Sequence, residues 1–137
     1  MKRAYFESLE HCASVTELDL SEVTNELGFD SQGLVPVITQ DASSKEVLML
    51  AWMNKAALTE TLATGYVTYW SRSRNQLWVK GETSSHTQRL VSLSIDCDGD
   101  AVLCQVNQTG AACHTGRMHC FYIQADTQRQ TVRVVDS

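Results

Sequence analysis

Short runs of β-branched and aromatic residues, separated by polar segments, dominate the hydrophobic pattern of this chain. Residues 33–40 predict a strand, and the single proline, Pro36, indicates that this strand begins as an edge strand does. A second, buried strand is expected at residues 47–52. Five more strand-like runs follow, at residues 66–71, 76–80, 89–95, 101–107 and 131–135. Because the connections between these runs are short, we expect antiparallel pairing in a mainly β domain.

One prominent helix is expected to pack on these strands. Asn54 is the expected N-cap of a helix that runs to about Thr64, and Gly65 is the expected residue after its end. The residues expected to form its buried stripe are Ala57, Leu58, Thr61 and Leu62. The pattern therefore predicts the α+β class, mainly β with helices.

Residues 1–30 carry helical signals of their own. Ser14-x-x-Glu17 is a candidate capping box, and Gly28 would close a short helix that starts near Ser21. The chain has 137 residues, a length typical of one domain. We therefore expect a single domain over residues 1–137, with residues 1–30 as a helical N-terminal extension.

Composition and charge narrow the class of protein. Hydrophobic residues make up 43% and charged residues 20%, which is typical of a globular protein. The net charge of -5 argues against general nucleic-acid binding. No apolar run reaches the ~20 residues that span a bilayer, and no secretory signal is visible. Five cysteines, an odd number, indicate free thiols or metal ligands in a reducing compartment, so we expect a cytoplasmic protein.

An acidic segment contains the first candidate metal ligands. Asp96, Asp98 and Asp100 alternate with Cys97 and Gly99. On an extended strand the three carboxylates would share one face and Cys97 would point to the other. Carboxylates suit hard cations such as Mg²⁺. A calcium-binding EF-hand loop is excluded because the sixth and twelfth positions are not Gly and Glu. The alternative is a polar turn with solvated aspartates.

Three cysteines, Cys97, Cys113 and Cys120, suggest a second metal site. Three thiolates around Zn²⁺ would leave one tetrahedral position for water, which is the pattern of a catalytic zinc. The alternative is that they are ordinary buried cysteines, the interpretation preferred for Cys12 and Cys104. Thiolate ligands would lower the pKa of a zinc-held water less than imidazoles do, so a separate base is needed. His114 is the best candidate, and His86 and His119 are weaker ones.

A basic stretch stands out in this acidic chain. Its cations are Arg72, Arg74, Lys80 and Arg89, interleaved with serines and threonines. Guanidinium groups and hydroxyls suit phosphate binding, although such residues also serve simply as solvated surface. Trp70 and Trp78 could stack on a base or belong to the core.

Several short motifs taken together resemble phosphoribosyl-AMP cyclohydrolase. They lie at residues 96–100, 113–116 and 120–121, with upstream segments at 70–74, 77–78 and 80–84, and the resemblance covers residues 33–122. Enzymes of this family hydrolyse the N1–C6 bond of the adenine ring in 1-(5-phosphoribosyl)-AMP, giving the formimino-carboxamide ribotide in L-histidine biosynthesis. They are homodimers that use Zn²⁺ and Mg²⁺, and their fold is a β pseudo-barrel capped by a helix. The resemblance implies the same reaction, metals, assembly and fold for this chain.

The resemblance also implies functions for individual residues. Asp96, Asp98 and Asp100 would bind Mg²⁺, and Zn²⁺ would be held by Cys113, Cys120 and Cys97 of the partner subunit. The zinc would hold the water that attacks C6 of the ring, and His114 would transfer a proton. The expected substrate contacts are Arg72, Arg74, Lys80, Thr83, Ser84 and His86.

Two departures from the family pattern are visible. Ser85 stands where a glycine is usual, and residues 1–30 lie outside the resemblance. Some family members carry a fused phosphoribosyl-ATP pyrophosphohydrolase domain. Because the chain ends soon after Cys120, we expect that second activity to be absent.

Two other functional classes make different demands on the same residues. A zinc-stabilised module that senses nucleotides without turnover would need a closed four-ligand zinc, with His114 or His119 as the fourth ligand. A purine deaminase would release ammonia, but the chain lacks the H-x-E…P-C-x-x-C pattern of zinc deaminases.

Overall fold

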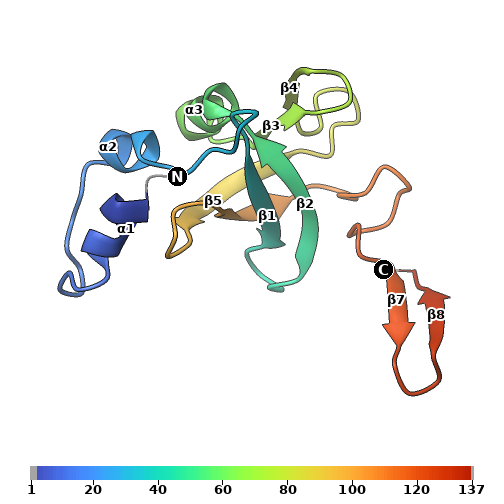
Figure 1. Ribbon diagram of the computed structural model, residues 1–137. Helices are drawn as coiled ribbons and strands as arrows, with labels where there is room; N and C mark the ends of the chain where they lie inside the picture. The colour runs from blue at the N-terminus through green and yellow to red at the C-terminus, as the bar shows by residue number, and fades with distance from the viewer. Residues whose placement is uncertain (1–2, 137) are drawn as a thin grey trace.

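A four-stranded sheet in the order β2-β1-β6-β5 forms the centre of the computed structural model, which describes residues 3–136 (Figure 1). Its strands are β1 (Val35–Asp41), β2 (Val47–Met53), β5 (Gln88–Ile95) and β6 (Val102–Gln108). β1 pairs antiparallel with β2, and β5 with β6, but β1 and β6 are parallel. The expectation of purely antiparallel pairing is therefore wrong. The reason is the long connection between β1 and β6, which allows the chain to return to the sheet in the same direction.

Pro36 lies at a position of β1 that is not paired with β6, so no backbone N–H donor toward β6 is required there. It pairs with Trp52 of β2, whereas the parallel ladder with β6 begins only at Val37. A proline lacks the backbone N–H that such a ladder requires. β1 is thus an internal strand whose first residues resemble an edge strand.

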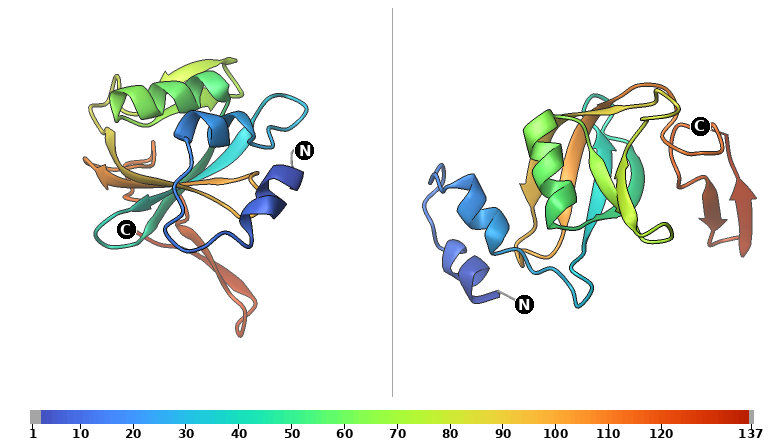
Figure 2. Two further views of the ribbon diagram at one scale, coloured as in Figure 1. Left: turned by 90° about the vertical axis from the view of Figure 1, so that its left-hand side faces the viewer. Right: turned by 90° about the horizontal axis from the view of Figure 1, so that it is seen from above.

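One helix and one hairpin cover a face of the sheet (Figure 2). The helix α3 (Lys55–Thr64) has the expected caps: the Asn54 side chain accepts from Ala57 N at 2.8 Å, and Gly65 is left-handed at φ 78. Its expected stripe is confirmed, with Leu62 only partly buried. The hairpin consists of β3 (Thr68–Ser71) and β4 (Gln76–Val79).

A chain of buried hydrogen bonds ties this covering layer to the sheet. The Tyr69 hydroxyl lies 2.6 Å from Thr39 Oγ1 of β1 and donates to Gln88 Oε1 of β5 at 2.6 Å. Gln88 Nε2 in turn donates to Gln108 Oε1 of β6 at 2.9 Å. Burial raises the pKa of Tyr69, so the phenol stays protonated and serves as a donor.

The N-terminal segment forms two short helices, α1 (Arg3–Leu9) and α2 (Leu20–Asn25). The N-cap of α2 is Asp19, whose side chain accepts from Glu22 N at 3.1 Å. The predicted capping box at residues 14–17 is wrong, because that segment lies outside both helices. Gly28 does not close α2 either, since its N–H donates to Gly99 O at 2.7 Å and ties the segment to the β5–β6 turn.

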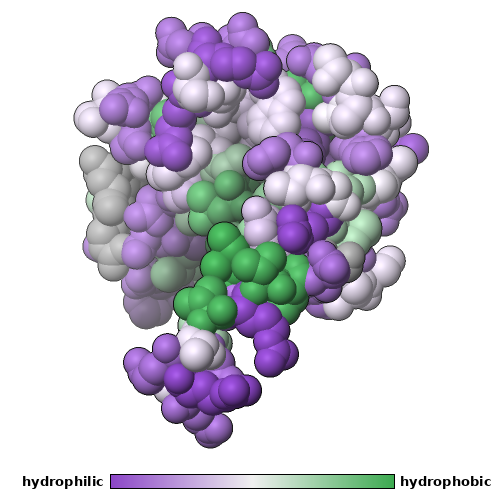
Figure 3. All heavy atoms as spheres, turned by 90° about the vertical axis from the view of Figure 1, so that its right-hand side faces the viewer, coloured by the Kyte–Doolittle hydropathy of each residue, from purple (hydrophilic) through white to green (hydrophobic). Residues whose placement is uncertain are grey.

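A second hairpin projects from the body near the C-terminus (Figures 1 and 2). It consists of β7 (Ile123–Asp126), which the sequence pattern did not predict, and β8 (Thr131–Val134). Ile123, Val132 and Val134 are well exposed, and Figure 3 shows apolar surface next to a polar lobe on this side of the molecule.

The described strands form three separate sheets, so within residues 3–136 no closed barrel is present. The fold is a mixed α+β arrangement of mostly strands with few helices. No helix in the described residues has the length and apolarity needed to span a membrane.

Candidate functional site

The loop between β6 and β7 brings two of the predicted zinc ligands together. Backbone hydrogen bonds from Cys113 N to Arg117 O at 3.1 Å and from Ala112 N to Met118 O at 3.2 Å fold the loop back on itself. Cys120 N donates to Leu48 O of β2 at 2.7 Å, which fastens its far end to the central sheet. As a result, the thiols of Cys113 and Cys120 lie close enough for each to affect the pKa of the other. We call residues 112–121 the thiol loop.

The two thiols have different tendencies to ionise. Burial opposes ionisation of Cys113, but the hydrogen bonds from Thr115, together with the influence of Cys120 and the charge of Arg117, outweigh it and hold the pKa of this thiol below its ordinary value. The Thr115 hydroxyl lies 3.1 Å from Cys113 Sγ. Burial, followed by the neighbouring Cys113, raises the pKa of Cys120 to about 11. Adjacent thiols of which one loses its proton readily are a suitable donor pair for a soft cation such as Zn²⁺.

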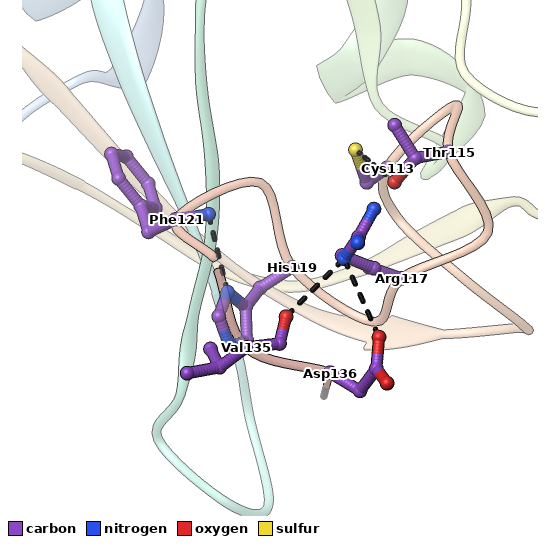
Figure 4. A network of polar contacts seen from close by, with 7 residues as sticks. All are labelled: Cys113, Thr115, Arg117, His119, Phe121, Val135 and Asp136. Carbon is purple, nitrogen blue, oxygen red and sulfur yellow. Dashed lines mark hydrogen bonds and ion pairs between the residues drawn. The ribbon is translucent and has the colours of Figure 1, made fainter. Parts of the chain in front are cut away.

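Arg117 anchors the thiol loop to the chain that follows β8 (Figure 4). Its Nε donates to Val135 O at 3.2 Å and lies 3.8 Å from an Asp136 carboxylate oxygen. Its guanidinium also sits 4.1 Å from the centre of the Tyr122 ring. These contacts hold the loop at the base of the β7–β8 hairpin.

The two histidines of the thiol loop differ in their surroundings. His119 is buried, and its Nδ1 accepts from Phe121 N at 3.1 Å (Figure 4). That bond engages the ring nitrogen, which leaves His119 unsuited to bind a metal through Nδ1. His114 is exposed beside Cys113.

Lys80 supports the thiol loop from inside. Its side chain is only 8% exposed, and Nζ donates to Ala112 O, next to Cys113, at 2.6 Å. Burial lowers the pKa of Lys80, and the nearby thiols of Cys120 and Cys113 act in the opposite direction. The structure thus places this predicted substrate contact beneath the loop.

The acidic segment is a turn. β5 ends at Ile95, and Asp96 Oδ1 accepts from Asp100 N at 2.9 Å and from Ala101 N at 3.2 Å. The expected strand alternation of carboxylates and Cys97 is therefore wrong, because the backbone bends immediately after the strand. Cys97 is exposed and lines a hollow under α1 and α2 together with Phe6.

Cys97 does not join the thiol pair within one chain. Across residues 3–136, no three Cys, His, Asp or Glu side chains gather closely enough to hold a metal ion. The donor chemistry of both predicted sites suits the metals named above, since carboxylates are hard donors and thiols are soft ones. A complete ion site would need further donors from water or from a second chain.

The remaining predicted substrate contacts fall into two groups. Arg72 and Arg74 lie in the turn between β3 and β4. The others, Thr83, Ser84 and His86, lie in the segment between β4 and β5. His86 is held closely, because a Cβ on Gly110 would lie 2.5 Å from its ring. Ser85, where a glycine is usual, has a left-handed backbone at φ 67.

Trp52 is a residue of this region that the sequence pattern missed. The Arg72 guanidinium carbon lies 4.7 Å from the centre of the Trp52 ring. The hydrophobic run at residues 47–52 suggested only a buried strand. In the structure Trp52 shares a strand face with Leu50, which is 49% exposed, and the continuous apolar run gave no signal of this.

Comparison with known proteins agrees with the motifs. The family model described as phosphoribosyl-AMP cyclohydrolase matches residues 49–122. The phosphoribosyl-AMP cyclohydrolase of Alkalilimnicola ehrlichii is 55% identical over 121 residues, which cover 88% of this chain and 85% of that protein. The Hyphomonas neptunium protein of the same name is 64% identical over 94 residues, or 69% of this chain and 72% of the relative. The chain therefore belongs to the phosphoribosyl-AMP cyclohydrolase family, a family of hydrolases.

Proposed function

We propose that this protein hydrolyses the N1–C6 bond of the adenine ring in 1-(5-phosphoribosyl)-AMP and so forms the formimino-carboxamide ribotide of L-histidine biosynthesis. Membership of the family supports the reaction. The observation that carries the mechanism is the proximity of Cys113 and Cys120 in the thiol loop, because it presents two soft donors at one point.

Zn²⁺ would be held by Cys113, Cys120 and Cys97 of the partner subunit. When bound, it would supply Lewis-acid activation of the water that attacks C6. Thr115 favours the ionised form of Cys113 by donating to its sulfur, and Lys80 fixes the backbone carbonyl of Ala112 just before it. Both contacts prepare the thiol loop before the metal arrives.

Mg²⁺ would be held at the β5–β6 turn by Asp96, Asp98 and Asp100. Asp96 already organises this turn through its two backbone hydrogen bonds, and the carboxylates are hard oxygen donors. The same turn carries Cys97, so a partner subunit that brings Cys97 to the thiol loop would also bring these carboxylates near the substrate. This coupling supports a homodimer as the active form.

His114 would exchange the protons of the reaction. It is exposed next to Cys113, and imidazoles are common general acids and bases. In the proposed mechanism it takes a proton from the attacking water or gives one to the leaving ring nitrogen.

The substrate phosphates would be bound by the hydroxyls and cations of the 72–86 region, among them Arg72 and Arg74. We propose that the active protein works in the cytoplasm as a single-domain enzyme.

The first test follows ring opening by ultraviolet absorbance in metal-loaded protein, with and without chelator. Cys113→Ser is expected to lose both zinc and turnover, whereas the control Cys12→Ser, at an exposed thiol outside the loop, keeps both. His114→Ala should keep zinc and lose turnover by roughly 10²–10⁴-fold. Turnover at the wild-type rate in zinc-free Cys113→Ser would refute the mechanism.

The shared site is tested by mixing two inactive variants. Cys97→Ser and Cys113→Ser are unfolded, mixed in equal amounts and refolded together with zinc. Half of the dimers then contain one chain of each kind, and one of their two sites is intact, so about a quarter of wild-type activity should return. If all the ligands came from one chain, mixing would restore nothing.

A further inference from the structure

All three tryptophans of the chain line one groove. Trp52 of β2, Trp70 of β3 and Trp78 of β4 border an open hollow of about 690 Å³. Leu50, Ser71, Arg72 and Ser73 line it as well. All three rings are only partly buried, so part of each aromatic surface remains exposed. We call this the tryptophan groove.

Arg72 lies across one wall of this groove. Its guanidinium carbon is 4.7 Å from the centre of the Trp52 ring, although the two residues belong to different elements. In the described part of the chain, no carboxylate forms an ion pair with Arg72. A guanidinium that stacks through its planar face keeps its N–H donors in the ring plane, where they can reach an oxyanion in a bidentate manner.

Polar groups around Arg72 add to this receptor. The hydroxyls of Ser71 and Ser73 lie 3.4 Å apart, and Arg74 N donates to Ser71 Oγ at 3.3 Å, which shapes the turn. An adjoining hollow, bordered by Arg72 and Trp70, includes the amide side chains of Asn54 and Asn75. In a chain of net charge -5, a cation without a carboxylate partner in this setting favours a negatively charged ligand.

The groove adjoins the thiol loop. Lys80 Nζ lies 5.0 Å from the centre of the Trp78 ring and donates to the Ala112 carbonyl before Cys113. In β2, the Leu48 carbonyl accepts from Cys120 N, and Leu50, two residues further along the same strand, lines the groove. A ligand anchored at Arg72 can therefore extend along the tryptophans toward the two thiols.

We propose that Trp52 is a positioning residue, whose ring holds the Arg72 guanidinium in the tryptophan groove in the orientation that binds a phosphomonoester group of the nucleotide substrate. The proposal rests on the proposed function, since the same substrate would place its ring near the thiol loop. Trp52 acts on the ligand through Arg72, and its ring restricts the conformations of that side chain before binding.

The groove is tested by binding without turnover. Because every tryptophan of the chain lies in the groove, intrinsic fluorescence of chelator-treated protein reports directly on its occupation. Titrations use 5′-AMP, ribose 5-phosphate and adenosine. We expect saturable changes with the two phosphate esters and at least tenfold weaker binding of adenosine, because adenosine lacks the charged group.

Matched variants separate Arg72 from Trp52. Arg72→Gln should weaken binding of 5′-AMP roughly 10- to 100-fold, through loss of charge-assisted hydrogen bonds. Trp52→Leu should weaken it about 3- to 20-fold, and Trp52→Phe, which keeps an aromatic face, should recover most of that loss. Arg129→Gln, at the tip of the projecting hairpin, should bind as wild type does. Calorimetric titration checks the affinities of the Trp52 variants, whose fluorescence itself is altered.

The positioning function has its own signature. If Trp52 acts through Arg72, the double variant Trp52→Leu/Arg72→Gln should bind no more weakly than Arg72→Gln alone. In the ring-opening assay, Trp52→Leu should raise KM and change kcat little. Equal affinity for adenosine and 5′-AMP, or wild-type affinity in Arg72→Gln, would overturn the proposal.

The proposal for the tryptophan groove and the proposed reaction can be refuted independently of each other. Wild-type KM in Arg72→Gln and Trp52→Leu, together with normal ring opening, would reject the groove and keep the proposed reaction. Phosphate-dependent binding that responds to both variants, without any ring opening by metal-loaded wild type, would support the groove and reject the reaction.

Discussion

Replacing Gly99 by alanine tests how the N-terminal helix docks on the acidic turn. Gly99 has φ +71, and a Cβ added there would overlap the ring of Phe6, with even Cζ only 2.6 Å away. Phe6 belongs to α1 and is 5% exposed, so its ring has little room to retreat. The substitution therefore introduces backbone strain and also displaces a buried aromatic ring.

The expected cost can be worked out from these two effects. A left-handed alanine costs about 1–2 kcal/mol. Expelling the Phe6 side chain into water costs about 1.5–3 kcal/mol. Gly99→Ala should thus lower the free energy of unfolding by about 2.5–5 kcal/mol. The matched control is Gly33→Ala, at φ +77 with no atom near its added Cβ, which should show the backbone cost alone.

A double-mutant cycle separates the two effects. In the Phe6→Ala background no ring remains to clash, so adding Gly99→Ala should cost only the backbone strain. The sum of the single-variant losses should therefore exceed the loss in the double variant by about 1.5–3 kcal/mol. Urea unfolding with linear extrapolation gives the four free energies. Additive losses, or equal losses in Gly99→Ala and Gly33→Ala, would refute the contact between α1 and the turn.

Three further predictions concern stability. Tyr69→Phe removes the buried partner of Thr39 Oγ1 and of Gln88 Oε1 and should cost about 1–3 kcal/mol in urea unfolding; no loss would show that the Tyr69 hydroxyl does not stabilise the fold. Ser85→Gly should raise the melting temperature by about 3 °C by relieving the left-handed backbone at φ 67, and a lowered value would contradict that strain. The N–H groups of Ser44 and Ser43 donate to the Asp41 carboxylate and lower its pKa. The carboxylate therefore stabilises the fold fully at pH values above its unfolded pKa of about 3.9. This stabilisation is lost as the pH falls through the lower, folded-state pKa. The urea midpoints of wild type and Asp41→Asn should therefore converge at low pH, and a gap that widens on acidification would count against this assignment.

Local signals in the sequence predicted the elements whose stability depends on near neighbours. Asn54 and Gly65 define α3 through bonds to residues three or four positions away, and both ends were predicted correctly. The strand runs were also placed to within a few residues. The capping box at residues 14–17 failed because Asp19 provides a competing cap for α2.

The family and the two thiols of the thiol loop were also predictable from the sequence. The motif set identified the family, which the comparisons confirmed. The arrangement of the acidic segment was not predictable, because strand alternation was applied to residues that the structure folds into a turn. Trp52 was missed for a related reason: a continuous apolar run does not reveal which of its side chains meets a residue of another element.

The sequence by itself determined the caps, most of the strands and the presence of soft and hard metal donors, because these depend on residue type and on neighbours a few positions away. Tertiary structure alone decided the parallel pairing of β1 with β6, the docking of Phe6 on Gly99 and the assembly of three tryptophans around Arg72. These contacts join residues far apart in the chain. They form only when the burial of the whole core compensates for the entropy of bringing distant segments together.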